Sequence, residues 1–164
     1  MKKVIEKISI ILATGFGSGY LPLGPGSWGA ALMAVGCWWL LDLPLIWYLI
    51  IIIGFFFLGT GVSSIADRHL FKKTGQLHDN NQIVIDEWVG MMVTLLPLFF
   101  FERTLLNVII GFLMFRIFDT VKFGLAKIAD QWQNRWGVML DDLFAGVYSA
   151  VFLFIVLWIM RSVG

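Results

Sequence analysis

Charged residues are scarce in this sequence, and the two signs nearly cancel. They make up 14% of the 164 residues and leave a net charge of +1, whereas soluble domains carry about a quarter charged residues. Such a chain offers no basic surface for nucleic acid, so we expect no nucleic-acid partner. The single cysteine, Cys37, excludes a disulfide framework and a thiolate zinc site, because both need more sulfur.

Hydrophobic residues are abundant instead. They account for 59% of the chain, and the mean hydropathy is +0.85. Too little polar sequence remains to enclose them in a soluble shell, so we expect the lipid bilayer to be the solvent. We predict an all-α fold over residues 1–164: a single domain built as a polytopic membrane helical bundle, with four to five membrane-embedded helices and an N-terminal interfacial helix. No pattern indicates the oligomeric state.

Five apolar segments account for the expected membrane helices. Only the second and the fifth approach the ~20 apolar residues that a full span needs. The others must use flanking residues, thin the bilayer or cross only part of it. The segments are Trp28–Leu41, Leu45–Val62, Trp88–Phe101, Leu105–Phe118 and Leu143–Met160.

Residues 1–14 predict a helix that lies in the membrane interface. Its apolar residues can share one helical face while its charged residues lie elsewhere, which is typical of interfacial helices. The apolar face holds Val4, Ile5, Ile8, Ile11 and Leu12.

The distribution of basic residues predicts the orientation. With a cytoplasmic N-terminus, only Arg103 and Arg161 fall outside, as the positive-inside rule favours. The residues placed inside are Lys2, Lys3, Lys7, Arg68, Lys72, Lys73, Lys122, Lys127 and Arg135. The same orientation gathers nearly all carboxylates on the inner side. We therefore expect a multi-pass protein whose chemistry faces the cytoplasm.

A glycine-rich segment, residues 15–29, precedes the first apolar helix. Glycines let backbone N–H groups converge on a ligand, and Ser27 stands where it could cap the helix, whose positive end would favour a phosphate. The alternative is an ordinary loop at the membrane surface, which glycine content alone does not exclude. The candidate phosphate contacts are Gly17, Ser18, Gly26 and Ser27.

Two pairs of adjacent carboxylates, Asp86-Glu87 and Asp141-Asp142, are predicted to open apolar helices from the same side. One such pair could simply be favourable charge at a helix N-terminus. Two pairs that face each other at low dielectric repel, and they are tolerated most easily around a cation. Carboxylate oxygens are ligands that Mg²⁺ prefers, so these pairs predict a magnesium site.

A third motif combines both charge signs on one helical face. Spacings of three place Arg116, Asp119 and Lys122 together. Arg116 follows an apolar run, and an ionisable group at that depth is a functional candidate. A phosphate-binding pair of cations beside a metal-binding carboxylate would need this geometry. The alternative is a ladder of ion pairs that is satisfied within the helix.

Other phosphatase chemistries lack the residues that they require. The position six residues after Cys37 is Leu43 rather than arginine, so a cysteine-phosphatase loop is missing. His69 and His78 lack the serine and arginine context of membrane histidine phosphatases. No Asp-x-Asp-x-Thr/Val stretch occurs, which argues against a haloacid-dehalogenase-type enzyme. The predicted catalytic groups are therefore acidic.

Together, these motifs resemble those of the phosphatidylglycerophosphatase A family. The resemblance extends from about Leu12 to Gly146. The matching stretches are residues 15–19 with 25–29, 83–87 with Gly90, 115–119 with Lys122, and 137–142 with 145–146. The chain departs from the family pattern at residues 123–125, at 134–136 and at Asn80. These departures spare the carboxylates but touch a loop that could position the head group.

The resemblance implies a bacterial inner-membrane enzyme that uses Mg²⁺ to hydrolyse phosphatidylglycerophosphate to phosphatidylglycerol and phosphate. The metal would polarise the phosphoryl oxygens and activate water, while Arg116 and Lys122 neutralise the phosphate. The family's acidic motifs map here onto Asp86, Glu87, Asp119, Asp141 and Asp142. The expected metal ligands are Asp86, Glu87, Asp141, Asp142 and, as a looser match, Asp79; Asp119 is expected to be a ligand or the general base.

Two other functions remain as alternatives. A head-group transferase of the CDP-alcohol type would also be membrane-embedded and rich in carboxylates, but it needs an Asp-Gly-x-x-Ala-Arg stretch that residues 142–146 do not supply. A divalent-cation transporter would need carboxylates near the middle of the membrane, whereas these are predicted at helix starts.

Overall fold

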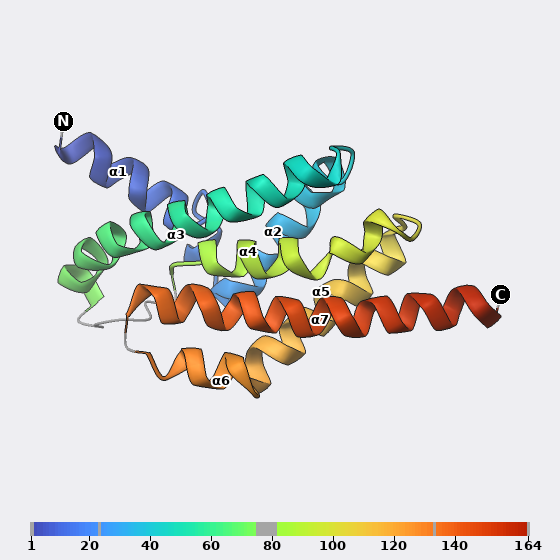
Figure 1. The fold of residues 1–164 in the computed structure, drawn as a ribbon. Helices are drawn as coiled ribbons and strands as arrows, with labels where there is room; N and C mark the ends of the chain where they lie inside the picture. Colours follow the sequence, from blue (N-terminus) through green and yellow to red (C-terminus); the bar gives the residue numbers. More distant parts are fainter. Residues whose placement is uncertain (1, 23, 75–81, 133, 164) are drawn as a thin grey trace.

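The computed structural model describes residues 2–22, 24–74, 82–132 and 134–163, and all regular structure in these ranges is helical (Figure 1). The all-α prediction is confirmed for the described residues. In chain order the elements are α1 (Lys2–Ala13), η1 (Ser18–Tyr20), α2 (Pro25–Leu40), α3 (Leu45–Thr74), α4 (Ile85–Thr94), η2 (Leu96–Phe99), α5 (Leu105–Val121), α6 (Leu125–Asp130) and α7 (Arg135–Val163).

Helix α4 lies at the centre of the bundle. It packs on α7, α2, α3 and α5, and Figure 1 shows it between α3 and α7. Nine of its 10 residues are buried. Its first turn carries Asp86 and Glu87, which confirms that this acidic pair opens an apolar helix. The surrounding helices therefore hold the pair inside the protein.

The predicted helix Trp88–Phe101 is wrong at both ends. The α-helix begins at Ile85 and stops at Thr94, and the 3-10 helix η2 follows it. Pro97 explains the break, because its ring lacks an N–H group and clashes with the preceding turn. An α-helix of 10 residues rises about 15 Å, which is about half of a bilayer's hydrocarbon core.

Two helices, α3 and α7, are long and apolar enough to cross a membrane. The qualifying segments are Leu45–Leu70, with 26 residues, and Arg135–Val163, with 29. Only 28% of the most apolar stretch of each is buried, so most of these side chains have no protein to cover them. The core helix of a soluble protein would be buried instead. Helices α2 and α5 are shorter, with 16 and 17 residues.

The second acidic pair occupies a different place from the one predicted. We expected a helix to begin at Leu143, but α7 begins at Arg135, so Asp141 and Asp142 lie within the helix. Stabilisation of carboxylates by the helix dipole is confined to the first turn. That effect therefore cannot account for these two buried carboxylates, and their partners must be found on other helices.

Helices α4 and α7 approach each other at two glycines. A Cβ atom added to Gly146 would lie 2.5 Å from the carbonyl oxygen of Gly90, and one added to Gly90 would lie 2.8 Å from the carbonyl oxygen of Asp142. Neither position has room for a side chain. Small residues allow such close backbone contact in membrane bundles, and here the contact sets Asp142 beside the first turns of α4.

Two polar contacts join α3 to its neighbours. Arg135 of α7 pairs with Asp67 of α3, and both are buried. His69 of α3 lies 2.8 Å from Glu6 of α1. The apolar face predicted for the N-terminal helix is largely exposed, and its exposed members are Val4, Ile5, Ile8 and Ile11. Leu12 packs against the core instead.

We expect Gly146→Ala to destabilise the bundle, because the added methyl group would push α4 away from α7. Overpacking of a tight core costs about 1–3 kcal/mol, so the thermal midpoint in detergent should fall by roughly several degrees. Gly54→Ala is the matched control, since a Cβ there meets nothing within 4 Å and alanine favours a helix. Equal midpoints for the two variants would contradict the close crossing.

Candidate active site

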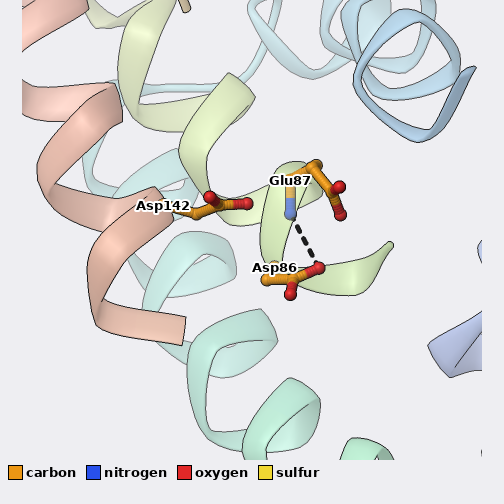
Figure 2. A group of neighbouring side chains, drawn as sticks. All are labelled: Asp86, Glu87 and Asp142. Atoms are coloured by element: carbon orange, nitrogen blue, oxygen red, sulfur yellow. Dashed lines mark hydrogen bonds between the residues drawn. The ribbon is translucent and has the colours of Figure 1, made fainter. Parts of the chain in front are cut away.

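Three carboxylates converge where α4 and α7 meet. Asp86 and Glu87 come from the first turn of α4, and Asp142 comes from α7 (Figure 2). One oxygen of each lies within 4.8 Å of the others. Asp86 and Asp142 are buried, with 6% and 5% exposure. Anionic groups held this closely away from water repel strongly unless a cation compensates them.

Glu87 indicates most clearly that the three carboxylates need a further partner. Its Oε2 atom is buried and has no hydrogen-bond partner among the described residues. A buried oxygen without a partner carries a desolvation cost, which a bound cation or a proton would offset.

The first turn of α2 lies close to Glu87. A Cβ atom added to Gly26 would overlap the Oε1 atom of Glu87 and would lie 3.5 Å from Nη1 of Arg116. Only glycine leaves room for both side chains here. This role was not foreseen, since we expected Gly26 to contact the phosphate rather than to make room for Glu87 and Arg116.

Cationic side chains from the end of α5 face the carboxylates. Arg116 pairs with Asp119 one turn on, with Nη1 and Oδ2 2.9 Å apart. Lys122 has left the helix, with a φ of 41°. Its Nζ donates to Asp130 and to Asp141, each at 2.6 Å. The alternative, a ladder of ion pairs satisfied within the helix, is thus only half present, because Lys122 pairs with Asp130 of α6 and Asp141 of α7 rather than with Asp119.

The ion pairs of Lys122 stabilise the protonated form of its amine. Partial burial lowers the pKa of the Lys122 amine, but the hydrogen bonds to Asp130 and Asp141 outweigh this and raise it above its usual value. Lys122 is therefore a permanent cation. It also occupies a carboxylate oxygen of Asp141, so Asp141 differs in its surroundings from the cluster of Asp86, Glu87 and Asp142.

A polar pocket of about 250 Å³ connects these groups. Small-molecule pockets usually measure about 300–1,000 Å³, so this one suits a head group rather than a whole lipid. Its lining comprises Gly24, Pro25, Gly26, Ile83, Asp86, Glu87, Arg116, Asp119, Lys122, Val138, Asp141 and Asp142. All five predicted catalytic acids and both predicted cations lie in this set.

Other predicted site residues lie elsewhere. Gly17, Ser18 and Ser27 are not part of the pocket lining, and the Ser18 hydroxyl donates to the Thr14 carbonyl oxygen at 3.5 Å. The prediction that Ser27 caps α2 is wrong: Gly24 is the N-cap and Pro25 the first residue. Proline suits that position because its missing N–H would have no partner there. The predicted ligand Asp79 lies outside the described residues.

The carboxylate cluster fits a hard divalent cation. Its donors are all oxygens, and one of them is buried without a partner. Mg²⁺ prefers oxygen ligands and commonly takes only one or two carboxylates, with water and phosphate completing the shell. Asp86, Glu87 and Asp142 are the residues that could hold it. Asp130, the second partner of Lys122, was not predicted, and no sequence pattern marks it.

Fold and site together are those of a helical protein with two helices suited to a bilayer and a polar pocket that has both carboxylates and cationic side chains. Residues 11–157 match the family described as Phosphatidylglycerophosphatase A. The chain belongs to the phosphatidylglycerophosphatase A family.

Two curated relatives bear the name of this family. The chain is 35% identical to Phosphatidylglycerophosphatase A of Escherichia coli, covering 89% of this chain and 81% of that protein. It is 29% identical to the Haemophilus influenzae protein of the same name, covering 92% of each. It is also 34% identical to a Bacteroides thetaiotaomicron protein named "Putative phosphatidylinositol-3-phosphatase", covering 93% of this chain and 96% of that one. No solved structure matches.

Lys122→Met should lower stability, because it leaves the buried Asp141 carboxylate without its cation. Removing one partner of a buried pair costs about 3–5 kcal/mol, and less here because Lys122 is itself 31% exposed. The thermal midpoint in detergent measures the change. Lys127→Met, at an exposed lysine of α6, should leave the midpoint unchanged. A second change, Asp141→Leu, should recover part of the loss; an additive loss would show that the pair is not coupled.

Proposed function

We propose that this protein hydrolyses phosphatidylglycerophosphate to phosphatidylglycerol and inorganic phosphate. The observation that carries the proposal is the pocket itself: in a chain of the phosphatidylglycerophosphatase A family, three clustered carboxylates face Arg116 and Lys122 across about 250 Å³. The anionic side suits a divalent cation, and the cationic side suits a phosphomonoester. Both are needed to bring a dianionic phosphate beside acidic groups.

Arg116 and Lys122 bind and orient the terminal phosphate. Arginine can contact two phosphate oxygens at once, and the pairing with Asp119 holds its guanidinium at the pocket wall. Lys122 contributes a fixed point charge. Because it bridges Asp130 and Asp141, it keeps α6 and α7 in register with the end of α5.

Mg²⁺ is the proposed cofactor, held by Asp86, Glu87 and Asp142. When bound, it would stabilise negative charge on the phosphoryl oxygens as a Lewis acid. Asp119 is the proposed proton acceptor for the attacking water, since it lines the pocket and its position is set by Arg116. Asp141 supports the site by orienting Lys122 rather than by joining the cluster. Charge neutralisation and positioning are the main contributions that proteins make to phosphoryl transfer.

The helix lengths and the order of the helices support a proposal for the membrane arrangement. We propose that α2 and α5 cross the bilayer with α3 and α7, that α4 and η2 form a partial or fifth passage, and that α1 lies in the interface. The starts of α2, α4 and α7 and the ends of α3 and α5 then share one side. This side carries most of the lysines and arginines, so it faces the cytoplasm of a bacterial inner membrane.

Phosphate release from phosphatidylglycerophosphate by the purified protein in detergent tests the proposal. Glu87→Gln and Asp142→Asn should each reduce kcat/KM by on the order of 100-fold or more, since each removes charge at the reacting centre. Glu102→Gln, at an exposed carboxylate in the loop before α5, is the control and should retain activity. Chelation of divalent cations should abolish wild-type turnover, and Mg²⁺ should restore it.

Phosphatidylinositol 3-phosphate belongs in the same assay, because the Bacteroides thetaiotaomicron relative bears the name of a phosphatase for that lipid. A higher kcat/KM for phosphatidylinositol 3-phosphate would replace the proposed substrate but keep the proposed chemistry. A wild-type rate in both acidic variants would refute the site. Turnover that requires a nucleotide would favour a transferase, and cation flux into liposomes without phosphate release would favour a transporter.

Gly26→Ala should impair the reaction without unfolding the protein. The methyl group would displace the Glu87 carboxylate from its place beside Arg116, and kcat/KM should fall by about tenfold or more. Gly36→Ala lies in the same helix, where a Cβ would meet only the Met33 sulfur at 3.7 Å, so it should keep the wild-type rate. Equal activity of both variants would show that Glu87 does not need this space.

A further inference from the structure

An apolar groove of about 570 Å³ runs between α2 and α5. On each wall, successive lining residues are one or three positions apart in the chain, so they lie on one face of the helix. The α2 wall consists of Ala31, Ala34, Val35, Trp38 and Trp39, and the α5 wall consists of Leu105, Val108, Ile109 and Phe112. Every one of these side chains is apolar in character, and several are more than half exposed: Val35 at 57%, Trp39 at 64% and Leu105 at 67%.

The groove begins close to the polar pocket, because the same two helices build both. Gly26 of α2 and Arg116 of α5 line the pocket, while Ala31 and Phe112 are the groove residues nearest to them in the chain. With a rise of 1.5 Å per residue, these gaps are only about 7 Å and 6 Å along the helices. A phospholipid whose phosphate is bound at Arg116 would therefore have the groove within reach of its apolar part.

Charged side chains lie at the far end of the groove, beside Trp38. Arg103 lies over the Trp38 ring, 5.2 Å from its centroid, donates to the Trp38 carbonyl oxygen and pairs with Asp42 at 2.6 Å. From Ala31 to Trp39 the groove extends about 12 Å. Together with the gap to the pocket, the groove reaches about 20 Å along the helices, which is more than half of the ~30 Å hydrocarbon core.

We propose that this groove binds an acyl chain of the phospholipid substrate while its phosphate occupies the Arg116–Lys122 side of the pocket. The inference rests on the proposed function. An acyl chain is the occupant that this proximity argues for, because a phospholipid joins an apolar chain to an anionic phosphate. The substrate is then recognised through both its phosphate and its acyl chain, and it stays in the membrane during the reaction.

The test is Val35→Trp, which fills the groove midway, compared with Val151→Trp, a matched change at a valine of α7 with 53% exposure outside the groove. Each variant is assayed with long-chain phosphatidylglycerophosphate and with a short-chain analogue too small to reach past the first turn of the groove. Val35→Trp should raise KM for the long-chain substrate about tenfold and leave the short-chain kcat/KM unchanged. Val151→Trp should change neither.

Equal loss on both substrates would mean that Val35→Trp acts on the fold, and no loss on either would mean that the groove is not used; both results overturn the proposal. A change in oligomeric state caused by Val35→Trp would assign the groove to a second copy of the chain, and would also overturn it.

A binding measurement separates this inference from the proposed function. A phosphatidylglycerophosphate analogue with a photoreactive acyl chain should label the α2 and α5 walls, and unlabelled phosphatidylglycerophosphate should compete while phosphatidylcholine should not. This result would support the groove even if the wild-type protein released no phosphate. Labelling that both lipids compete equally would identify ordinary bilayer contact and overturn the proposal.

Discussion

Mutual repulsion among buried carboxylates is the constraint on which the arrangement of this protein depends. Asp86, Glu87 and Asp142 share a space less than 5 Å across in a predominantly apolar bundle, where ionised groups lose hydration and their repulsion is weakly screened. Such a cluster is maintained only if the fold forces it together and if positive charge is supplied. The close contact between Gly90 and Gly146 holds α4 and α7 together, and Arg116 and Lys122 are the positive charges that the protein itself supplies.

The surrounding helices position both the carboxylates and the cations. Helix α4 is short and buried, so its first turn is held between α7 and the beginning of α2. Helix α5 ends beside it with two cations, one directed to its own helix and the other to α6 and α7. The result is a pocket with an anionic and a cationic wall built from four helices. The family assignment and this charge distribution point to the same kind of ligand, a phosphate ester attached to a lipid.

Much of the fold and of the candidate site could be predicted from local sequence patterns. Asp86 and Glu87 open a helix, as their position before an apolar run indicated, and Arg116, Asp119 and Lys122 all reach the pocket. The break at Pro97 was also visible in the sequence but was read as part of a continuous helix. Three features depend on contacts between distant segments and could not be read locally: the separate surroundings of Asp141 and Asp142, the pairing of Lys122 with Asp130, and the fit of Gly26 against Glu87. Ser27 has a good capping side chain, but Gly24 and Pro25 begin the helix earlier.

The uncovered apolar surfaces of α3 and α7 have a consequence for how the protein meets its substrate. Side chains such as Ile53, Phe57 and Trp158 are more than half exposed and need hydrocarbon around them. Enzyme and lipid then encounter each other by diffusion in a plane. The quantity that governs saturation is the mole fraction of substrate among the surrounding lipids, and diluting the membrane with inert phospholipid would slow the reaction even at constant bulk concentration.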